Sequence, residues 1–559
     1  MKNCIHYLNS YIGTWPVLTA LFALSLGLSV SAQQTPSGIT FAINTSIKND
    51  TSPPLKSLPM IRVPAELRQI PLPRLNPNRM AAVFTRPVLD RVAQSKEGPA
   101  VLIKLVASID GLGREFPDIH GHPMKITTMP PDANGAVGDT QYVQIVNTFF
   151  VVFDKADLIK AGVKSTKPVI PVLGWAPISI IWQGFGGECE QSAYGDPIVQ
   201  YDKIAKRWII TQLRLVRTGF CQCIAVSTTS NATGPYNRYE FDEPLFNDYP
   251  KLGVWPNGYF ITYNMLDAEW KPQGARICAY ERAKMLAGKP AREIAAQLGR
   301  PFLSLLPADF DGIPDKKHLP APDSPCYLLS LGARENSLDF WKFHVDWNEP
   351  GKSTFGDGKG GPNATLDVAP FSDAPSEDAI PQLGTSQKLF GLGERLLYRL
   401  AYRRVADHES LVATHSVGGA AIAAPRWYEI RNPGVAPTVS QQGTFSPDSI
   451  SRWMGSIAMD RSGNIALGYN ASSVSSHPSI RITARRSDDA DGIMGEEKIV
   501  AESSSSQEGE EAFRWGDYSS MSVDPVDDTT FWFTSEYLTT KKNGVLNWST
   551  RIIAFSLAK

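Results

Sequence analysis

The sequence predicts an all-β protein, specifically a β-propeller, most simply with seven blades. From about Thr128 onward, short runs rich in Val, Ile, Tyr, Trp and Phe alternate with Gly, Pro, Asn and Asp. The first group favours strands and the second favours turns. One unit recurs along this region: a turn with a small or acidic residue, a strand, a short turn and a second strand. The composition agrees, because the 559 residues include 44 Gly, 42 Pro and 13 Trp.

The spacing of this unit supports a ring of blades. Its copies begin at residues 138, 195, 248, 326, 394, 455 and 516, at intervals of 57, 53, 78, 68, 61 and 61 residues. A period of roughly 50–60 residues with two or more strands per unit fits propeller blades, because one small sheet cannot bury both of its faces alone. Six or eight blades are also compatible with the pattern. A large β-sandwich or two all-β domains is the alternative architecture.

Residues 1–32 have the features of a signal peptide. Lys2 precedes an apolar stretch from Pro16 to Leu28, and Val30-Ser31-Ala32 supplies the small residues that signal peptidase accepts. A retained membrane anchor is the alternative, although the stretch is short for a span of about 20 residues. We therefore expect a secreted or periplasmic protein with no membrane span after cleavage of the signal.

The rest of the chain divides into two predicted parts. Residues 33–125 are rich in Pro, Ser and Thr and are expected to form an extended leader or a strap over the main domain, with disorder as the alternative. Residues 126–559 are expected to form the propeller, with insertions near 281–325 and 485–511. The first insertion contains a helix-like stretch, Glu281–Leu298. The net charge of −1 gives no basic surplus, so no nucleic-acid partner is predicted.

Five cysteines follow the signal peptide: Cys189, Cys221, Cys223, Cys278 and Cys326. Export would place them in an oxidising compartment, where disulfides form. We expect Cys189 to pair with Cys221 or Cys223, and we put Cys189–Cys221 forward. The Cys221-Gln222-Cys223 motif lacks a second pair of metal ligands, so no zinc site is predicted from it.

Charged residues stand at or near the starts of the repeated units, where a propeller gathers its innermost strands around one end of a channel. We therefore expect these side chains to converge. The carboxyls are candidate catalytic groups, one as acid and a second as base or nucleophile in cleavage of a sugar. The arginines are candidate ligand-binding residues, because a guanidinium binds a carboxylate with two hydrogen bonds. The carboxyls are Asp139, Asp196, Asp248, Glu394 and Asp517, and the arginines are Arg395, Arg452 and Arg514.

These residues also have a structural interpretation. An Asp at a strand start satisfies the N–H groups of its turn, and Arg and Asp of neighbouring blades form pairs.

Asp309, Asp311 and Asp315 alternate around a Gly turn and are the candidate metal ligands, for Ca²⁺. The loop lacks the distal Glu of an EF-hand, and a solvated turn is the alternative.

No other cofactor is predicted, because no phosphate-binding, dinucleotide-binding or haem motif occurs. His408 and His415 lie near Ser410, but without a nucleophile elbow we interpret them as polar strand residues.

Three stretches resemble exported bacterial proteins described as sialidase- or BNR-like propellers: Pro130–Asn147, Arg452–Tyr469 and Arg514–Tyr537. The resemblance implies a propeller over roughly residues 128–557 and an exported bacterial setting, but it supplies no activity. The sialidase Asp-box is incomplete, since Asp460 and Gly463 are kept and the Thr-Trp ending is missing. The arginine triad and the Tyr/Glu pair of sialidases have no identifiable equivalents.

Together these patterns predict an exported propeller that binds a carbohydrate or peptide-like ligand on its funnel face. Glycoside hydrolase-like chemistry is one interpretation, and a non-catalytic binding or adhesion propeller is the other.

Overall fold

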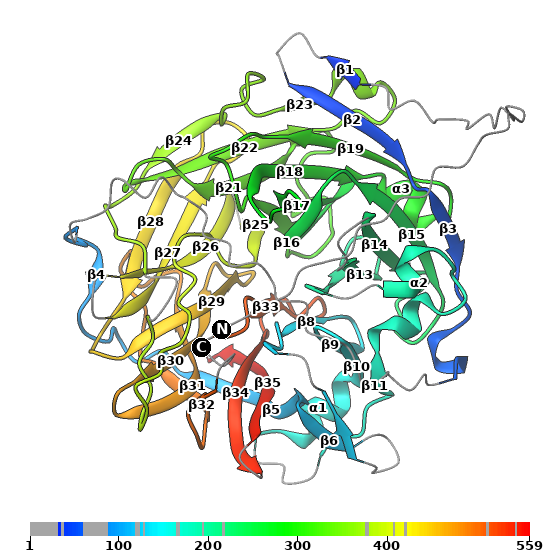
Figure 1. Cartoon of the computed structure of the whole chain (residues 1–559). Coiled ribbons are helices and arrows are strands. Elements are labelled where there is room, and N and C mark those ends of the chain that lie inside the picture. Colours follow the sequence, from blue (N-terminus) through cyan, green and yellow to red (C-terminus); the bar gives the residue numbers. More distant parts are fainter. Residues whose placement is uncertain are drawn as a thin grey trace, which may run out of the picture.

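The computed structural model describes most of the chain after the signal region (Figure 1). The described residues are 32–34, 39–59, 88–117, 123–126, 129–163, 168–192, 195–214, 219–374, 379–405, 408–418, 422–509, 514–542 and 545–558. The signal peptide prediction therefore lies almost wholly outside the described residues.

The described strands form small antiparallel sheets arranged in a ring, which defines a β-propeller (Figure 1). In the described part of the chain these strands fall into seven groups in chain order, two of which share one sheet, and we number the groups as blades for reference.

The first three blades each contain four consecutive strands. Blade 1 has β8 (Asn134–Val137), β9 (Gln141–Val146), β10 (Phe149–Asp154) and β11 (Leu173–Pro177). Blade 2 has β12 (Ile198–Asp202), β13 (Arg207–Leu213), β14 (Phe220–Ser227) and β15 (Tyr236–Glu243). Blade 3 has β16 (Phe246–Trp255), β17 (Gly258–Leu266), β18 (Pro272–Tyr280) and β19 (Arg292–Gln297).

Blades 4 and 5 join into one sheet through a short parallel pairing of β20 with β25. Blade 4 has β20 (Leu306–Phe310), β21 (Cys326–Leu331), β22 (Ser337–His344), β23 (Thr354–Phe355) and β24 (Ala364–Asp367). Blade 5 has β25 (Leu400–Val405), β26 (His408–Gly418), β27 (Ala423–Arg431) and β28 (Thr438–Phe445).

Blade 6 again uses consecutive strands, and blade 7 takes one strand from the N-terminal part of the chain. Blade 6 has β29 (Ser451–Met459), β30 (Ile465–Ser473), β31 (Ser476–Arg485) and β32 (Lys498–Glu502). Blade 7 has β33 (Ser520–Val523), β34 (Phe531–Lys542), β35 (Val545–Leu557) and β5 (Ile103–Gly113).

The innermost strands surround the centre of the ring (Figure 1). Each contacts the innermost strand of the next blade, and β33 of blade 7 contacts β8 of blade 1. The ring is closed at blade 7. There β5, which comes before blade 1 in the sequence, pairs antiparallel with β35 near the C-terminus. This pairing ties both parts of the chain into one sheet.

Each blade is packed on both faces, so its strands are more continuously apolar than a half-exposed strand would be. All nine residues of β17 are buried. Between blades 1 and 2, Val143 and Phe150 belong to one apolar cluster with Ile210 and Ala225. The β-branched and aromatic content of the sequence therefore forms the layers between blades.

The described parts of the predicted leader lie on the outer edges of the blades (Figure 1). β2 (Thr40–Thr45) pairs with β19, β3 (Lys48–Thr51) with β15, and β4 (Ala93–Gln94) with β28. The remaining short strands are β1 (Ala32–Gln34), β6 (Glu115–Pro117) and β7 (Pro123–Lys125).

Helices are few and short in the described part of the chain. They are α1 (Lys155–Ala161), α2 (Glu188–Ser192) and α3 (Arg282–Leu286), with 3-10 turns at Leu55–Ser57, Ile178–Trp182 and Pro350–Lys352. None of them combines the length and the apolar character needed to span a bilayer.

Two of the predicted units begin one strand later than the blades in the structure. Gly138 and Cys326 precede or open the second strand of their blades, whereas the innermost strands β8 and β20 begin earlier. The helix-like stretch Glu281–Leu298 contains only the short α3, followed by the outer strand β19. The region expected as an insertion at 281–325 therefore supplies strands to blades 3 and 4.

Candidate functional site

Acidic side chains gather near the starts of several innermost strands. Asp132 precedes β8, Asp196 precedes β12 and Asp517 precedes β33. Asp248 lies in β16, where the register against β17 shifts. We call the group to which they belong the acidic cluster, and its members are Asp132, Asp196, Asp248, Tyr249, Lys251, Glu394, Arg395, Arg514, Asp517, Tyr518 and Glu536.

The backbone of the acidic cluster is unusual. Asp132, Asp196 and Tyr249 have φ values of 50°, 41° and 53°, in the left-handed region that non-glycine residues seldom adopt. The register of β16 shifts between Asp248 and Lys251, which bends the strand locally. Such conformations persist only where the surrounding structure fixes them, and they are frequent at functional sites.

Tyr518 connects blades 2, 3 and 7 within the cluster. Its hydroxyl lies 3.1 Å from Asp196 Oδ2 and 3.1 Å from the carbonyl oxygen of Pro250. The Nζ of Lys251 lies 3.1 Å from the centroid of the Tyr249 ring and 3.8 Å from that of Tyr518. The Lys251 amine is thus buried between two aromatic rings.

A second part of the cluster surrounds Asp517. Arg514 forms an ion pair with Asp517 at 2.7 Å, and the backbone N–H of Asp517 donates to Asp132 Oδ1 at 2.7 Å. The N–H of Gly516 donates to Glu536 Oε1 at 3.1 Å. The turn before β33 is therefore fixed by carboxylates from blades 1 and 7.

Glu394 and Arg395 complete the cluster as an ion pair of their own. Arg395 Nη2 lies 2.6 Å from Glu394 Oε1, and its guanidinium lies over the Tyr249 ring at 4.6 Å. By contrast, neither Asp196 nor Asp248 forms an ion pair with a described residue. The cluster reaches solvent mainly through Arg514, whose side chain is 20% exposed.

The surroundings shift the protonation of these carboxyls. Burial and the Asp517 charge raise the pKa of Asp196 to about 6. Burial and the charges of Asp196 and Asp517 raise the pKa of Asp248 to about 7. Burial also lowers the pKa of Lys251 well below its usual value. Two neighbouring carboxyls therefore titrate near neutral pH, as the acid and the base of a hydrolytic pair must.

Asp139 and Arg452 do not join the acidic cluster, which corrects the expectation that all the unit starts converge. Asp139 lies just before β9, the second strand of blade 1, and pairs with Lys206 at 2.9 Å near the surface. Arg452 is fully buried between Asp448 and Glu497, at 2.8 and 2.7 Å. Asp139 lies outside the cluster because it precedes the second strand of its blade and not the innermost one. Arg452 lies outside it because its ion pairs are formed within blade 6.

The candidate Ca²⁺ ligands are separated by the structure. Asp309 and Asp311 are buried and pair with Arg399 at 2.6 and 2.9 Å, and Asp311 also pairs with Lys203. Although burial acts to raise it, these cations lower the pKa of Asp311 to about 2. Asp315 instead lies on an exposed turn. Internal cations therefore occupy the positions that a metal ion would need, and the three carboxylates form no common site.

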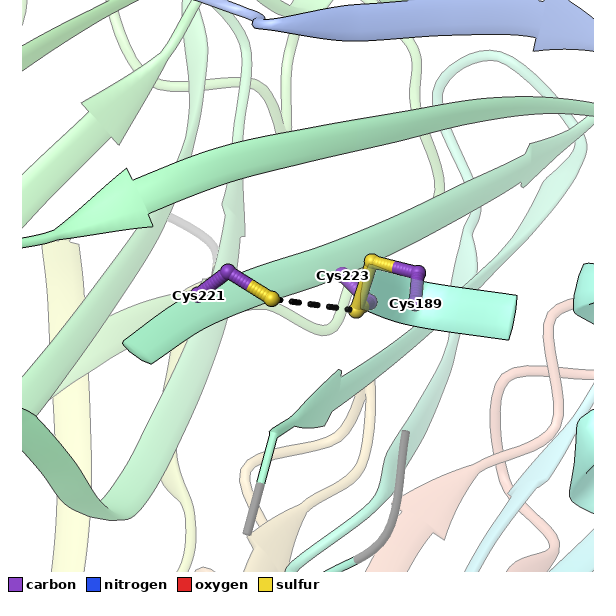
Figure 2. Close-up of side chains that lie close together, drawn as sticks. All are labelled: Cys189, Cys221 and Cys223. Carbon is purple, nitrogen blue, oxygen red and sulfur yellow. Dashed lines mark hydrogen bonds between the residues drawn. A yellow bond between two sulfur atoms is a disulfide. The ribbon is translucent and has the colours of Figure 1, made fainter. Parts of the chain in front are cut away.

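The disulfide joins Cys189 to Cys223, not to Cys221 as put forward from the sequence (Figure 2). Cys221 and Cys223 are two apart on β14, so their side chains share one face of the sheet. Cys221 remains a buried free thiol. Both pairings lie within reach of Cys189 on α2, which is why sequence spacing alone left them open.

Several members of the cluster were not singled out from the sequence. Asp132, Tyr249, Lys251, Tyr518 and Glu536 were missed, although Asp132 and Tyr518 lie in two of the three stretches that carry the resemblance. Asp132 follows the same pattern as Asp196, an acidic residue two positions before an innermost strand. That signal was hidden because the first unit was placed at Gly138.

The fold and the site define a β-propeller with a largely buried acidic cluster near the starts of its innermost strands. No family model matches the chain, and no curated protein matches it. The sialidase or BNR resemblance is therefore supported only as far as the propeller fold.

Among solved structures, the chain is similar to the N-terminal domain of Nup159, with 10% identity, a TM-score of 0.37, and coverage of 83% of this chain and 99% of that one. The WD40 domain of SCAP from fission yeast shows 8% identity, a TM-score of 0.32, and coverage of 77% and 86%. An exo-β-1,3-galactanase from Phanerochaete chrysosporium shows 11% identity, a TM-score of 0.27, and coverage of 80% and 96%. No family or activity is inferred from similarities of this size.

Proposed function

We propose that this chain is an exported β-propeller whose acidic cluster binds a carbohydrate and hydrolyses a glycosidic bond. The observation that carries the proposal is the pair Asp196 and Asp248. Both are buried carboxyls without an ion-pair partner among the described residues, and their pKa values are raised to about 6 and 7. Export is supported by the signal-like N-terminus, and the secreted protein should then begin at Gln33.

The two carboxyls suit different roles. Because the pKa of Asp248 is raised further, to about 7 against about 6 for Asp196, we assign Asp248 as the acid and Asp196 as the base or nucleophile. Asp248 donates its proton to the leaving oxygen, and Asp196 either activates water or attacks the anomeric carbon. Water then supplies the oxygen of the new hydroxyl on the sugar, and the catalytic acid regains its proton. The hydroxyl of Tyr518 donates to Asp196 and favours its ionised form.

A second candidate function is non-catalytic binding. Glu394 and Asp517 are each paired with an arginine of the same chain, at 2.6 and 2.7 Å. A cluster whose charges are satisfied internally also serves as a rigid platform for a ligand. In that case the propeller binds glycans through its exposed rim and leaves them intact.

One parallel experiment separates the two candidates. The secreted protein is assayed against a panel of polysaccharides and chromogenic glycosides, and the same preparation is applied to a glycan array. Release of sugar that is lost in Asp196→Asn and Asp248→Asn, and kept in Asp139→Asn, supports hydrolysis. Array binding with no release of any sugar supports the second function. The anomeric form of the first product, followed by NMR, shows whether Asp196 acts as base or nucleophile.

A further inference from the structure

Three cysteine sulfurs lie together beside blade 2, two of them on β14 and one on α2 (Figure 2). The Sγ atoms of Cys189, Cys221 and Cys223 are all within 4.8 Å of one another, and the three residues are buried. Cys189 and Cys223 form the disulfide, while the Sγ of Cys221 lies 3.9 Å from that of Cys223. The free thiol thus lies directly beside the disulfide.

We propose that reduction of this disulfide opens a three-thiolate binding site for a thiophilic cation of the Zn²⁺ class. A Zn–S bond is about 2.3 Å long, so two thiolates on one tetrahedral ion lie roughly 3.8 Å apart. Cys221 and Cys223 already have this separation, because they are alternate residues on one face of β14. Cys189 comes from the opposing helix α2 and supplies the third sulfur.

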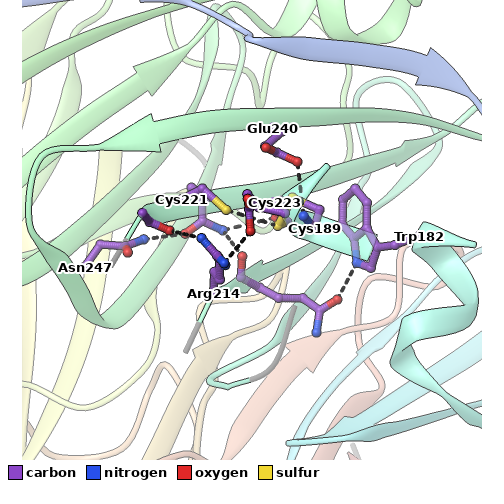
Figure 3. The surroundings of a disulfide bond; sticks show 11 residues. Trp182, Cys189, Arg214, Cys221, Cys223, Glu240 and Asn247 are labelled. Carbon is purple, nitrogen blue, oxygen red and sulfur yellow. Dashed lines mark hydrogen bonds and ion pairs between the residues drawn. A yellow bond between two sulfur atoms is a disulfide. The ribbon is translucent and has the colours of Figure 1, made fainter. Parts of the chain in front are cut away.

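The surroundings favour a cation at this position. Glu240 and Asp242 on β15 lie directly opposite Cys223 and Cys221 in the register of the sheet. The Glu240 carboxylate already reaches the cluster, where it accepts a hydrogen bond from the N–H of Cys189 at 3.1 Å (Figure 3). It is therefore the candidate fourth ligand, as an oxygen donor completing a tetrahedral set.

The charges around Cys221 favour a bound cation. The carboxylates of Glu240, Asp242 and Glu188 all lie near its thiol. The nearby Arg214 pairs with Glu188, so its positive charge is already engaged. Three thiolates in this environment require a compensating positive charge, which a bound divalent ion supplies.

The steps of the conversion balance. A dithiol reductant transfers two electrons and two protons to the Cys189–Cys223 bond, giving two thiols, and becomes a disulfide itself. The three cysteines then release their protons as the cation binds. The oxidised protein lacks two of the three thiolates and is expected not to bind.

The test uses the full-length protein with Co²⁺ as a spectroscopic probe. The protein is reduced with a dithiol, freed of reductant without oxygen, and titrated with Co²⁺, which is then displaced by Zn²⁺. We expect one Co²⁺ per chain with thiolate-to-cobalt absorption in the reduced protein and none in the oxidised protein. Cys221→Ser should weaken binding at least about tenfold. Cys326→Ser removes a buried thiol elsewhere in blade 4 and should bind like the wild type.

Two results would overturn the proposal. One is a folded, reduced wild-type protein without thiolate-to-cobalt absorption, and this comparison with the oxidised form needs no variant. The other is a folded Cys221→Ser protein that binds Co²⁺ as tightly as the wild type. Circular dichroism of each sample establishes that it is folded.

Discussion

The hydroxyl of Tyr518 lies 3.1 Å from the carboxylate of Asp196, linking blade 7 to blade 2 across 322 positions of sequence. The same hydroxyl contacts the carbonyl of Pro250 in blade 3. One phenol therefore connects three strand starts. It also fixes the carboxyl that we propose as the base or nucleophile.

The raised pKa values of the cluster predict how stability depends on pH. The folded protein keeps protons on Asp196 and Asp248 up to pKa values of about 6 and 7, whereas unfolded Asp loses them at about 4. Since the folded state then binds more protons, these groups contribute stability that is full below pH 4. That stability is lost as the pH rises through 6 and 7.

Asp248→Asn removes one of these groups. We expect its Tm at pH 8 to exceed that of the wild type by about 1–3 °C, with a smaller fall in Tm between pH 5 and pH 8. Thermal unfolding at the two pH values measures the difference. Asp139→Asn is the matched control, because Asp139 is paired with Lys206 near the surface. If both variants follow the wild-type pH profile, Asp248 does not titrate as described.

Arg399 is predicted to be essential to the stability of the fold. It neutralises Asp309 and Asp311, so Arg399→Met leaves two buried carboxylates with reduced compensation. We expect a loss of about 3–5 kcal/mol in the free energy of unfolding, measured by denaturant titration. The exposed pair Arg334–Asp367 provides the control, and Arg334→Met should change stability by about 0.5 kcal/mol or less. Equal effects of the two substitutions would contradict the buried network.

The disulfide is predicted to stabilise the fold through its pairing with Cys223. Its partners are separated by 34 positions, so its loss should lower the free energy of unfolding by about 2–4 kcal/mol. Cys223→Ala should therefore destabilise the oxidised protein more than Cys221→Ala, which keeps the disulfide. Peptide mapping under non-reducing conditions checks the pairing directly. Recovery of a Cys189–Cys221 peptide from the wild type would refute it.

Because β5 closes the ring, substitutions of two leucines that are ten positions apart should have unequal effects on the free energy of unfolding. Leu112 is fully buried in β5, whereas Leu102 lies just before the strand and is 65% exposed. Leu112→Ala should cost about 2–5 kcal/mol of unfolding free energy, and Leu102→Ala about 0.5 kcal/mol or less. Urea unfolding of both variants measures this, and a negligible cost at Leu112 would argue against β5 as a structural strand of blade 7.

Much of the fold follows from local sequence. The β-branched and aromatic runs predicted the strands, because both faces of each blade are buried and select these residues. It was harder to predict which strand is the innermost one of each blade. The innermost strands β8 and β20 are short, so their neighbours β9 and β21 gave the stronger local signal. The N-terminal region was expected as an extended leader or strap, but its individual strands were not predicted, because their partners are about 190 to 250 positions away.

The sequence predicted those residues of the acidic cluster whose place at the start of a repeated unit brings them together. Asp196, Asp248 and Asp517 meet because each lies at the start of an innermost strand. Asp309 and Asp311 looked like metal ligands because their cations, Lys203 and Arg399, are about 90 to 110 positions away. The choice between Cys221 and Cys223 depends on the placement of α2, which no local pattern encodes.

The central claim is that Asp248 donates a proton during glycoside hydrolysis, and leaving-group dependence tests it most directly. On a substrate found in the screen, kcat/KM is compared between wild type and Asp248→Asn for natural and activated nitrophenyl leaving groups. Loss of a general acid should reduce kcat/KM on the natural linkage by about 10²–10⁴-fold, with a much smaller effect on the activated glycoside. Equal losses on both substrates, or wild-type activity in the variant, would contradict the assignment.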